Sequence, residues 1–578
     1  MLSRYFRRYA MKKFTAVLLV LCMTLSILPA ASAAGSYTDV PAGHWAENVI
    51  AKAAAYQIML GKGGGRFGLG ENVTRAEFAA MLTRIMGWER PSPAAPTFAD
   101  NADPTQWYYA DIEALAAHDA VPSAVGSNFR PLEDITREEM AVMLVRALGF
   151  GSVAENLKTE ALAFTDVTDN RGYIMAAADF GIINGKSSTS FAPKEKALRE
   201  EAAAMMVRMY ERYHAQTDWL HGFYAFSSWP QKEFVPSFDA LSLGWSRLEY
   251  SVPGGVSLNT TAQNNNEWNI PSGMESAVSL FRENGVPVNL NVFMNTAQSV
   301  TLADGTKSNA CREILLNDEN REAAVRAIID EISTLYDGKA LYSGVTIDFE
   351  GLRGAEMRSA FSLFLSELRI LLPKGKELYC AVSPVTRAAE NTFDGYDYRQ
   401  IGAVCDKVIL MAHDYNATVM DNASMARGFT TTPLTPIDEI YCALDAITDE
   451  TTGVADRSKI ALALSFGSCG WSVKDHAVVN KNSMKPTPEQ VYFRLSQPET
   501  EIYYSATYRN PYMSYYDATD DTMNTVWYED ERSISDKINL AHMFGVTGVS
   551  VWRLGLIPAY EDPAGREIYY NVWDLLKR

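Results

Sequence analysis

Residues 343–350 read Ser343-Gly344-Val345-Thr346-Ile347-Asp348-Phe349-Glu350, a strand-length run that carries two acids at its end. Because successive side chains of a strand alternate between its faces, Asp348 and Glu350 leave the same face. Two such carboxyl groups repel each other when both ionise, which raises the pKa of at least one of them. One of the pair is therefore a candidate proton donor at neutral pH, although a solvated strand end would explain the same pattern.

Other short apolar runs flank this segment and alternate with helical stretches, which predicts parallel strands joined by crossover helices. The expected strands are Gly222–Phe226, Ala240–Trp245, Val288–Phe293, Gly344–Phe349, Leu378–Val382, Lys407–Met411, Ile460–Ser465 and Gly548–Trp552. Eight such units in residues 218–578 predict an α/β TIM (β/α)8 barrel with insertions, whose chemistry belongs at the C-terminal strand ends. A doubly wound open sheet is the alternative, but no Gly-rich phosphate loop follows the first strand.

Four segments of this half resemble glycoside hydrolase family 18. The family's catalytic motif is Asp-Gly-x-Asp-x-Asp-x-Glu, and this chain keeps Gly344, Asp348 and Glu350, with Ser343 and Thr346 in place of the other two acids. The sixth expected strand ends Met411-Ala412-His413-Asp414-Tyr415-Asn416, similar to the family's Met-x-Tyr-Asp, and the eighth ends in Trp552 where the family places a Trp. The segment Trp527-Tyr528-Glu529-Asp530 is most similar to the spore-cortex N-acetylglucosaminidase branch.

The resemblance implies substrate-assisted retaining hydrolysis of an N-acetylated glycan, in which the enzyme supplies no nucleophile. Glu350 would protonate the leaving oxygen, and Asp348 would orient the acetamido group whose oxygen attacks the anomeric carbon. Asp414, with a donor from His413 or Tyr415, would hold that group, and Trp552 would form an apolar floor under the sugar. The full expected substrate-binding set is His413, Asp414, Tyr415, Trp552, Tyr224 and Met411.

The departures from the family motif leave a second function open. Thr346 can donate a hydrogen bond to Asp348 but cannot share its proton. The third expected strand, Asn289–Phe293, lacks the family's Ser-x-Gly-Gly. The alternative to an enzyme is therefore a non-catalytic carbohydrate-binding or structural surface-layer protein with a degenerate barrel. Further aromatic residues are expected in loops, at Trp229, Trp268, Trp471, Tyr503, Tyr504, Tyr508, Tyr512, Tyr515 and Tyr516.

An internal repeat occupies residues 36 to about 212, in copies at about 36–92, 97–150 and 163–212. Each copy opens with an aromatic residue, a small residue and Asp, passes a turn that contains Phe, and closes with a helix. The closing helices of the first two copies begin at Thr74 and Thr136, each followed three residues later by Glu, which predicts capping boxes. The third copy has Leu198 at the cap position and lacks that bond.

These repeats resemble S-layer homology domains, which occur in threes on bacterial surface proteins. The resemblance implies an all-α module that binds secondary cell-wall polysaccharide, with the Arg that follows each cap as the anion contact: Arg75, Arg137 and Arg199. A guanidinium can grip a carboxylate with two parallel hydrogen bonds. Because a cation at the first turn of a helix opposes the helix dipole, a binding role explains these residues better than a plain surface position does.

The N-terminal residues and the net charge bear on export and on the kind of partner that the protein binds. Residues 1–33 have a basic start, an apolar run and a small-residue exit, which predicts a signal peptide rather than a membrane anchor. The net charge of -18, with no Lys/Arg stripe after residue 13, disfavours nucleic acid, and no nucleic-acid partner is expected. No cysteine or histidine spacing indicates a metal, and no cofactor is expected. The sequence therefore predicts a secreted protein, without a further membrane span, attached to the bacterial cell wall or S-layer.

Overall fold

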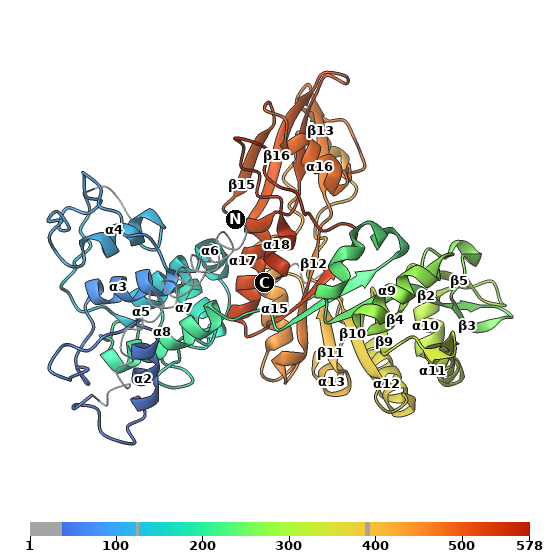
Figure 1. The fold of residues 1–578 in the computed structure, drawn as a ribbon, viewed down its shortest axis with the longest axis horizontal. Coiled ribbons are helices and arrows are strands. Elements are labelled where there is room, and N and C mark those ends of the chain that lie inside the picture. The colour runs from blue at the N-terminus through green and yellow to red at the C-terminus, as the bar shows by residue number, and fades with distance from the viewer. Residues whose placement is uncertain (1–36, 123–125, 388–392, 578) are drawn as a thin grey trace, which may run out of the picture. The chain divides into compact units, whose positions relative to one another are not determined.

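The computed structural model describes residues 37–122, 126–387 and 393–577 (Figure 1). The chain divides into two compact units. The first holds the described residues up to Phe150 together with Ala161–Ala177 and Ile182–Tyr210, and the second holds Gly151–Glu160, Ala178–Gly181 and the residues from Glu211 onward. The expected signal peptide lies outside the described residues.

The first unit is built from one pair of helices for each repeat. The helices are α2 (Glu47–Ala55), α3 (Arg75–Met86), α4 (Tyr109–Ala117), α5 (Arg137–Ala147), α7 (Arg171–Asp179) and α8 (Arg199–Tyr213). The capping boxes expected at Thr74 and Thr136 are confirmed, each with its Glu partner. At Leu198 half of the box remains, because the Glu201 side chain accepts a hydrogen bond from the Leu198 backbone at 3.1 Å.

The Asp that opens each repeat holds the turn that contains Phe. Asp39 accepts hydrogen bonds from the backbone of Phe67, Gly68 and Leu69 at 2.7–3.2 Å. In the third repeat, the same kind of bonds lowers the pKa of Asp166 to about 2. The recurring aromatic–small–Asp pattern is thus explained by local structure, since a carboxylate that collects backbone N–H groups fixes a tight turn.

Isolated β-bridges join the three repeats to one another. They connect the first repeat to the third, the first to the second, and the second to the third: Asn72↔Leu198, Thr74↔Asp134 and Thr136↔Lys196. The repeats therefore close on themselves as a ring of three, which lets helix pairs that could not bury their apolar faces alone form one core.

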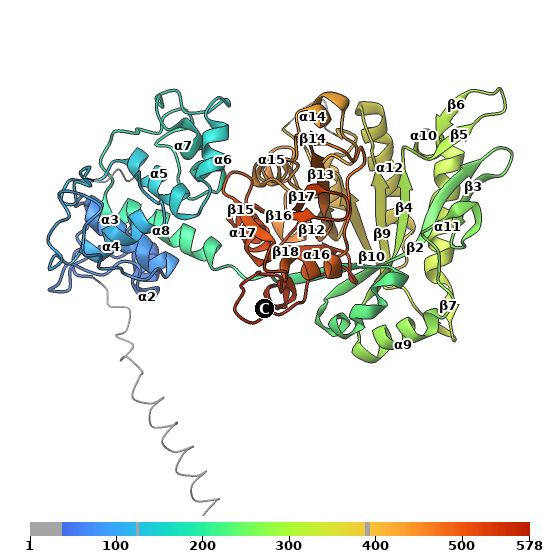
Figure 2. The same cartoon turned by 90° about the horizontal axis from the view of Figure 1, so that it is seen from above.

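The second unit contains a closed barrel of eight parallel strands (Figure 2). The strands are β1 (Trp219–Tyr224), β2 (Ala240–Ser251), β4 (Val288–Asn295), β9 (Gly344–Glu350), β10 (Glu377–Val382), β11 (Lys407–Leu410), β12 (Ile460–Ser465) and β18 (Gly548–Trp552). Pairing of β1 with both β18 and β2 closes the cylinder. The expectation of a TIM-type barrel is confirmed, and the open sheet is excluded because it would leave two barrel strands without a second neighbour.

The second unit contains helices that follow the barrel strands and others, such as α16, that pack on the inserted sheet. They are α6 (Gly151–Leu157), α9 (Met274–Asn284), α10 (Ala310–Leu315), α11 (Asp318–Ser333), α12 (Ala355–Leu371), α13 (Tyr398–Val404), α14 (Asn422–Ala426), α15 (Ile437–Thr448), α16 (Pro488–Leu495), α17 (Glu531–Met543) and α18 (Val572–Leu576). β2 continues past the barrel into an antiparallel hairpin with β3 (Gly255–Asn259). Two small hairpins, β5–β6 (Ser299–Thr301, Lys307–Asn309) and β7–β8 (Leu335–Tyr336, Lys339–Ala340), complete this part.

A second, antiparallel sheet is inserted between β12 and α17 (Figure 1). Its strands are β13 (Cys469–Lys474), β14 (Ala477–Val478), β15 (Glu501–Ser505), β16 (Asn510–Asp517) and β17 (Thr522–Trp527). Glu529, just after β17, is buried and forms an ion pair of 2.7 Å with Lys537 of α17. Asp530 caps the same helix. The segment Trp527–Asp530 therefore ties the inserted sheet to the barrel.

Candidate functional site

Asp348 and Glu350 both point into the barrel from β9. In the pairing with β4, Asp348 lies opposite Phe293, and Glu350, two residues nearer the mouth, lies opposite Asn295. Asp348 is buried, with 2% of its surface exposed, whereas Glu350 is half-buried. Among the described residues, the Glu350 carboxyl has no hydrogen-bond partner. The two carboxyl groups thus share one face, as the two-residue spacing predicts, but in different environments.

Electrostatics favour a protonated carboxyl group in this pair. Burial raises the pKa of Glu350, and the neighbouring charge of Asp348 raises it further, while His413 acts in the opposite direction. Burial also raises the pKa of Asp348, partly offset by a hydrogen bond from Asn291. Because two close carboxyl groups in a poorly solvated site ionise one after the other, the pair retains one proton to a higher pH than ordinary acids do.

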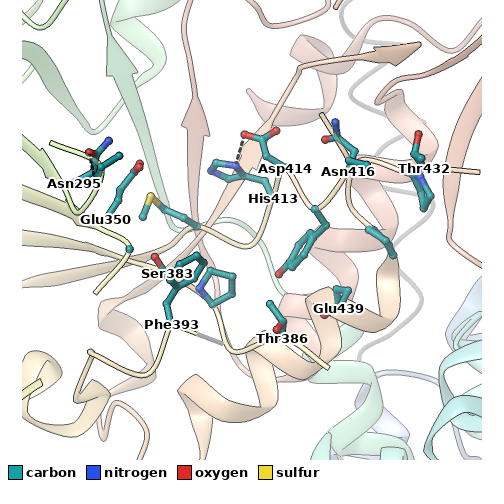
Figure 3. Close-up of a pocket in the computed structure, with 18 of the residues that line it drawn as sticks. Asn295, Glu350, Ser383, Thr386, Phe393, His413, Asp414, Asn416, Thr432 and Glu439 are labelled. Atoms are coloured by element: carbon teal, nitrogen blue, oxygen red, sulfur yellow. Dashed lines mark hydrogen bonds and ion pairs between the residues drawn. The ribbon is translucent and has the colours of Figure 1, made fainter. Parts of the chain in front are cut away.

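An open cleft of about 930 Å³ lies at the barrel mouth (Figure 3). Its lining includes Asn295, Glu350, Ser383, Phe393, Met411, His413, Asp414, Tyr415, Thr432 and Glu439. Figure 3 shows Glu350 and His413 facing each other across the cleft. Most lining residues come from the C-terminal ends of β4, β9, β10 and β11 and the loops that follow them, which is where barrel enzymes place their reactive groups, and Glu439 comes from the first turn of α15.

His413 and Asp414 form a pair at the end of β11. His413 Nδ1 lies 3.0 Å from one Asp414 carboxylate oxygen, and Ser465 of β12 donates a hydrogen bond of 3.1 Å to the other. Burial alone would raise the pKa of Asp414, but His413 and Ser465 hold it below its ordinary value. Asp414 is therefore an ionised acceptor that fixes the orientation of the His413 ring.

Two further expected residues lie in this cleft. The Tyr415 hydroxyl is buried and has no hydrogen-bond partner among the described residues, and burial raises its pKa well above the ordinary value. It is therefore a neutral donor and acceptor. Met411 contributes an apolar wall and packs on the cluster that fills the barrel interior.

Trp552 belongs to an aromatic group beside the cleft. Its ring centroid lies 5.2 Å from that of Phe223 and 5.7 Å from that of Trp268. Trp268 in turn stacks on Phe293 at 4.3 Å, and Phe293 is the strand neighbour of Asp348. An apolar surface therefore borders the buried acid, although Trp552 itself is not among the residues that line the cleft.

Tyr224 does not reach the cleft, which corrects its place in the expected substrate-binding set. Phe223 packs inside the barrel with Tyr379 and Ile409. Its neighbour Tyr224 points the other way and packs edge-on against Phe281 of α9, at 5.1 Å between ring centroids. Alternation along β1 therefore places Tyr224 in the layer between strand and helix.

Sequence reasoning missed Asn291, and it assigned Thr346 a different partner. Asn291 of β4 donates a hydrogen bond of 3.2 Å to Asp348. Thr346 was expected to make such a bond, but its hydroxyl lies 2.6 Å from the Ser242 hydroxyl instead. The available signal was the alternation Asn289-Leu290-Asn291 inside an expected barrel strand, where polar residues at every second position indicate an interior that is not wholly apolar.

The three arginines of the repeats have well-defined partners within the first unit. Each donates from Nε to the carbonyl of the Phe in the next repeat around the ring: Arg75 to Phe129, Arg137 to Phe191 and Arg199 to Phe67, at 2.6–3.0 Å. Arg75 and Arg199 also pair with Glu139 and Glu77 at 2.7 and 2.9 Å. All three are buried. These contacts between repeats are therefore sufficient to explain the three arginines. Contact with a ligand would be a role in addition to holding the repeats together.

Within residues 37–122, 126–387 and 393–577, no group of three or more His, Cys, Asp or Glu side chains is arranged to hold a metal ion. Over the same ranges, none of the helices combines the length and apolar character that crossing a membrane demands.

Comparison with known proteins identifies the domains. Residues 298–556 match the glycosyl hydrolases family 18, and residues 36–79, 102–141 and 163–203 match the S-layer homology domain. The cortical fragment-lytic enzyme of Bacillus subtilis (strain 168) is 28% identical over 246 residues, 42% of this chain and 52% of that protein. An S-layer protein of Bacillus thuringiensis subsp. finitimus is 30% identical over 206 residues, 35% of this chain and 25% of that protein.

Among solved structures, the spore cortex-lytic enzyme of Bacillus cereus aligns over 62% of this chain and 74% of its own, with 18% identity and a TM-score of 0.47. The chain spans about half the length, or less, of the curated relatives named above. The two family matches agree with the two units found in the structure. The chain therefore carries three S-layer homology domains followed by a domain of glycoside hydrolase family 18.

Proposed function

We propose that the barrel hydrolyses glycosidic bonds of N-acetylated glycans, peptidoglycan or chitin-like, by substrate-assisted retaining catalysis. One observation carries this proposal: Glu350 stands half-buried in an open cleft, without a hydrogen-bond partner among the described residues, directly above the buried acid Asp348. A carboxyl group kept protonated by burial and by a second carboxyl group is what a general acid at neutral pH requires.

In the proposed reaction the two acids have different roles. Glu350 donates its proton to the glycosidic oxygen as the bond to the anomeric carbon breaks. The carbonyl oxygen of the sugar's acetamido group forms the new bond to that carbon, giving an oxazolinium ion whose charge Asp348 stabilises. Glu350, now ionised, takes a proton from water as the water oxygen attacks the anomeric carbon and reopens the ring, with net retention of configuration.

The other cleft residues support recognition of the acetamido sugar. Asp414 and His413 form an oriented acceptor–donor pair, and the Tyr415 hydroxyl has no partner of its own among the described residues. The Bacillus subtilis relative acts on cortical fragments, as its name states, which supports a cortex-derived glycan as a substrate here.

Activity should extend to a higher pH than an ordinary glutamate would allow. The active form holds one proton on the pair, so the rate falls on the alkaline side as Glu350 loses it. Because the pKa of Glu350 is raised, this alkaline limb is expected well above the ordinary value of about 4.3. The dependence of kcat/KM on pH measures it, and an alkaline limb at about pH 4–5 would contradict the assignment.

One observation favours the alternative of a non-catalytic sugar-binding barrel. Thr346 stands where family 18 has a second acid, and its hydroxyl is engaged by Ser242 rather than Asp348. A barrel of this kind would bind N-acetylglucosamine oligomers without cleaving them. Hydrolysis by the wild-type protein therefore separates the two functions.

We propose further that the first unit attaches the protein to anionic cell-wall polysaccharide. A pocket of about 270 Å³ is lined by Lys62, Arg84 and Arg199, with Glu77 and Trp107. Trp107 is 59% exposed. Lys62 pairs with Glu71 at 2.7 Å and Arg199 with Glu77 at 2.9 Å, whereas the exposed Arg84 forms no ion pair among the described residues. A guanidinium of this kind next to an exposed aromatic ring suits a sugar that carries a carboxylate, because the ring stacks on the sugar and the cation pairs with the acid. This supports attachment through the pocket surface rather than through the buried arginines alone.

Replacing Trp107 by Ala together with Arg84 by Gln should weaken retention on purified cell walls by about tenfold, since a stacking contact and a charge are lost. Co-sedimentation of the full chain measures it. Trp45→Ala is the matched control, because Trp45 is 61% exposed in the first repeat but does not line this pocket. Unchanged retention of the double variant would contradict the proposed surface.

A further inference from the structure

The hydroxyl of Thr346 is committed to a chain of polar side chains below the catalytic pair. It lies 2.6 Å from the Ser242 hydroxyl, which lies 2.8 Å from His221 Nε2. His221 Nδ1 lies 2.8 Å from the Ser550 hydroxyl. All four side chains are buried, and burial lowers the pKa of His221 to about 3, so the chain is neutral. Among the described residues, Thr346 makes no hydrogen bond with Asp348.

Asn291 supplies the donor that Thr346 does not. It lies on β4 opposite Thr346, and its Nδ2 donates a hydrogen bond of 3.2 Å to Asp348 Oδ2. Ser246 of β2 donates to the Asn291 backbone carbonyl at 2.8 Å, which holds this part of β4 in place. Asn291 is fully buried, so bulk water does not compete with the Asp348 carboxylate for its amide donor.

Asp348 depends on this bond. Its other oxygen, Oδ1, is buried and has no hydrogen-bond partner among the described residues. Without Asn291, both oxygens of a buried carboxylate would lack a donor, and a carboxylate in that state takes up a proton rather than remain charged. Asn291 thus holds one oxygen of Asp348, while the other has no partner among the described residues. A carboxylate in this arrangement can accept an N–H from an acetamido group with its second oxygen.

We propose that Asn291 is the positioning residue for Asp348: its amide holds the carboxylate in orientation beneath Glu350, where Thr346 makes no contact. This assignment rests on the hydrolytic function proposed above. It explains how the barrel can work without the family's second acid, because an amide donor stabilises the ionised acid but, unlike a carboxyl group, does not exchange a proton with it.

The titratable groups around Asp348 are few, which makes the pH dependence readable. Glu350 comes from the same strand and Cys380 from β10, while His413 and Asp414, in the loop after β11, act on Glu350. The inward side chains of β4 near Asp348 are the neutral Asn291, Phe293 and Asn295. Removing Asn291 thus changes a donor and no charge.

The test is steady-state hydrolysis of an N-acetylglucosamine oligomer by the full chain across pH. Asn291→Leu, which keeps the side-chain size, should lower kcat at neutral pH by about tenfold, the effect of losing one hydrogen bond to a charged group, with a smaller change in KM. The acidic limb should move to higher pH, because Asp348 then binds its proton more tightly. Thr346→Val is the matched control, expected to leave that limb in place.

A second readout does not depend on turnover. Infrared difference spectra across pH should show the Asp348 carboxyl band, identified by its loss in Asp348→Asn, titrating at higher pH in Asn291→Leu than in wild type. If Asn291→Leu does not fold, Asn291→Ala serves, since it removes the same donor without adding a charge and should move the acidic limb the same way. The assignment is overturned if Asn291→Leu moves neither the carboxyl band nor the acidic limb. It is also overturned if Thr346→Val, and not Asn291→Leu, produces the shift. An inactive wild type with a shifted band would refute hydrolysis but not the Asn291–Asp348 coupling.

Discussion

Glu350→Gln should reduce turnover of an N-acetylglucosamine oligomer by about a thousandfold, within the range that general acid catalysis contributes. Glutamine keeps the shape of the side chain but has no acidic proton to give to the leaving oxygen. Glu350 makes no hydrogen bond within the described residues, so the substitution breaks no structural contact and removes a carboxyl group whose pKa burial has raised. Stability should therefore be unchanged or slightly increased. Initial rates of reducing-end release, with thermal unfolding of both proteins, measure these effects.

Glu439→Gln is the matched control for this prediction. Glu439 lines the same cleft, and burial raises its pKa too, but the backbone N–H of Arg387 donates to its carboxylate at 2.9 Å. Its loss should cost far less activity than the loss of Glu350. A folded Glu350→Gln protein with wild-type turnover would refute the catalytic assignment.

The barrel could be predicted from sequence because most of its strands are continuous apolar runs. β12 and β18 begin and end where expected, at Ile460–Ser465 and Gly548–Trp552. β1 begins three residues earlier than expected, at Trp219, because His221 interrupts the apolar pattern. In the structure His221 is buried between Ser242 and Ser550, and a buried polar residue with both ring nitrogens bonded cannot be told from an exposed one by pattern alone.

The inserted sheet could not be predicted in the same way. Six aromatic residues expected in loops lie on β13, β15 and β16 instead: Trp471, Tyr503, Tyr504, Tyr512, Tyr515 and Tyr516. Their strands have one face against α16 and one partly open, so the pattern depends on which neighbours they pair with. Strand propensity is set largely by such packing partners, which a single sequence does not specify.

At the site, the sequence predicts which residues share one face of a strand, but not which residues of different strands are in contact. Two acids separated by one residue had to share a face, so Asp348 and Glu350 could be paired from the sequence. Asn291 lies 57 residues before Asp348, and only the pairing of β4 with β9 brings them together. The error at Tyr224 has the related cause that one position along a strand changes the face.

Removing the acetyl groups from the substrate should have an effect as large as removing Glu350. In the proposed reaction the acetamido oxygen is the nucleophile, held against the anomeric carbon by the sugar itself. An intramolecular nucleophile reacts orders of magnitude faster than a group that must first be brought into place, so its loss should slow cleavage by about a thousandfold or more. Asp348, buried and held by Asn291, is placed to support that group rather than to replace it.

The most direct test is the cleavage of two oligomers of equal length by the wild-type protein, one fully N-acetylated and one fully deacetylated, followed by mass spectrometry at matched concentration and pH. Substrate assistance predicts shorter products from the acetylated oligomer and essentially none from the other. Equal rates of cleavage would contradict the mechanism, because the bond would then be broken without the acetamido oxygen.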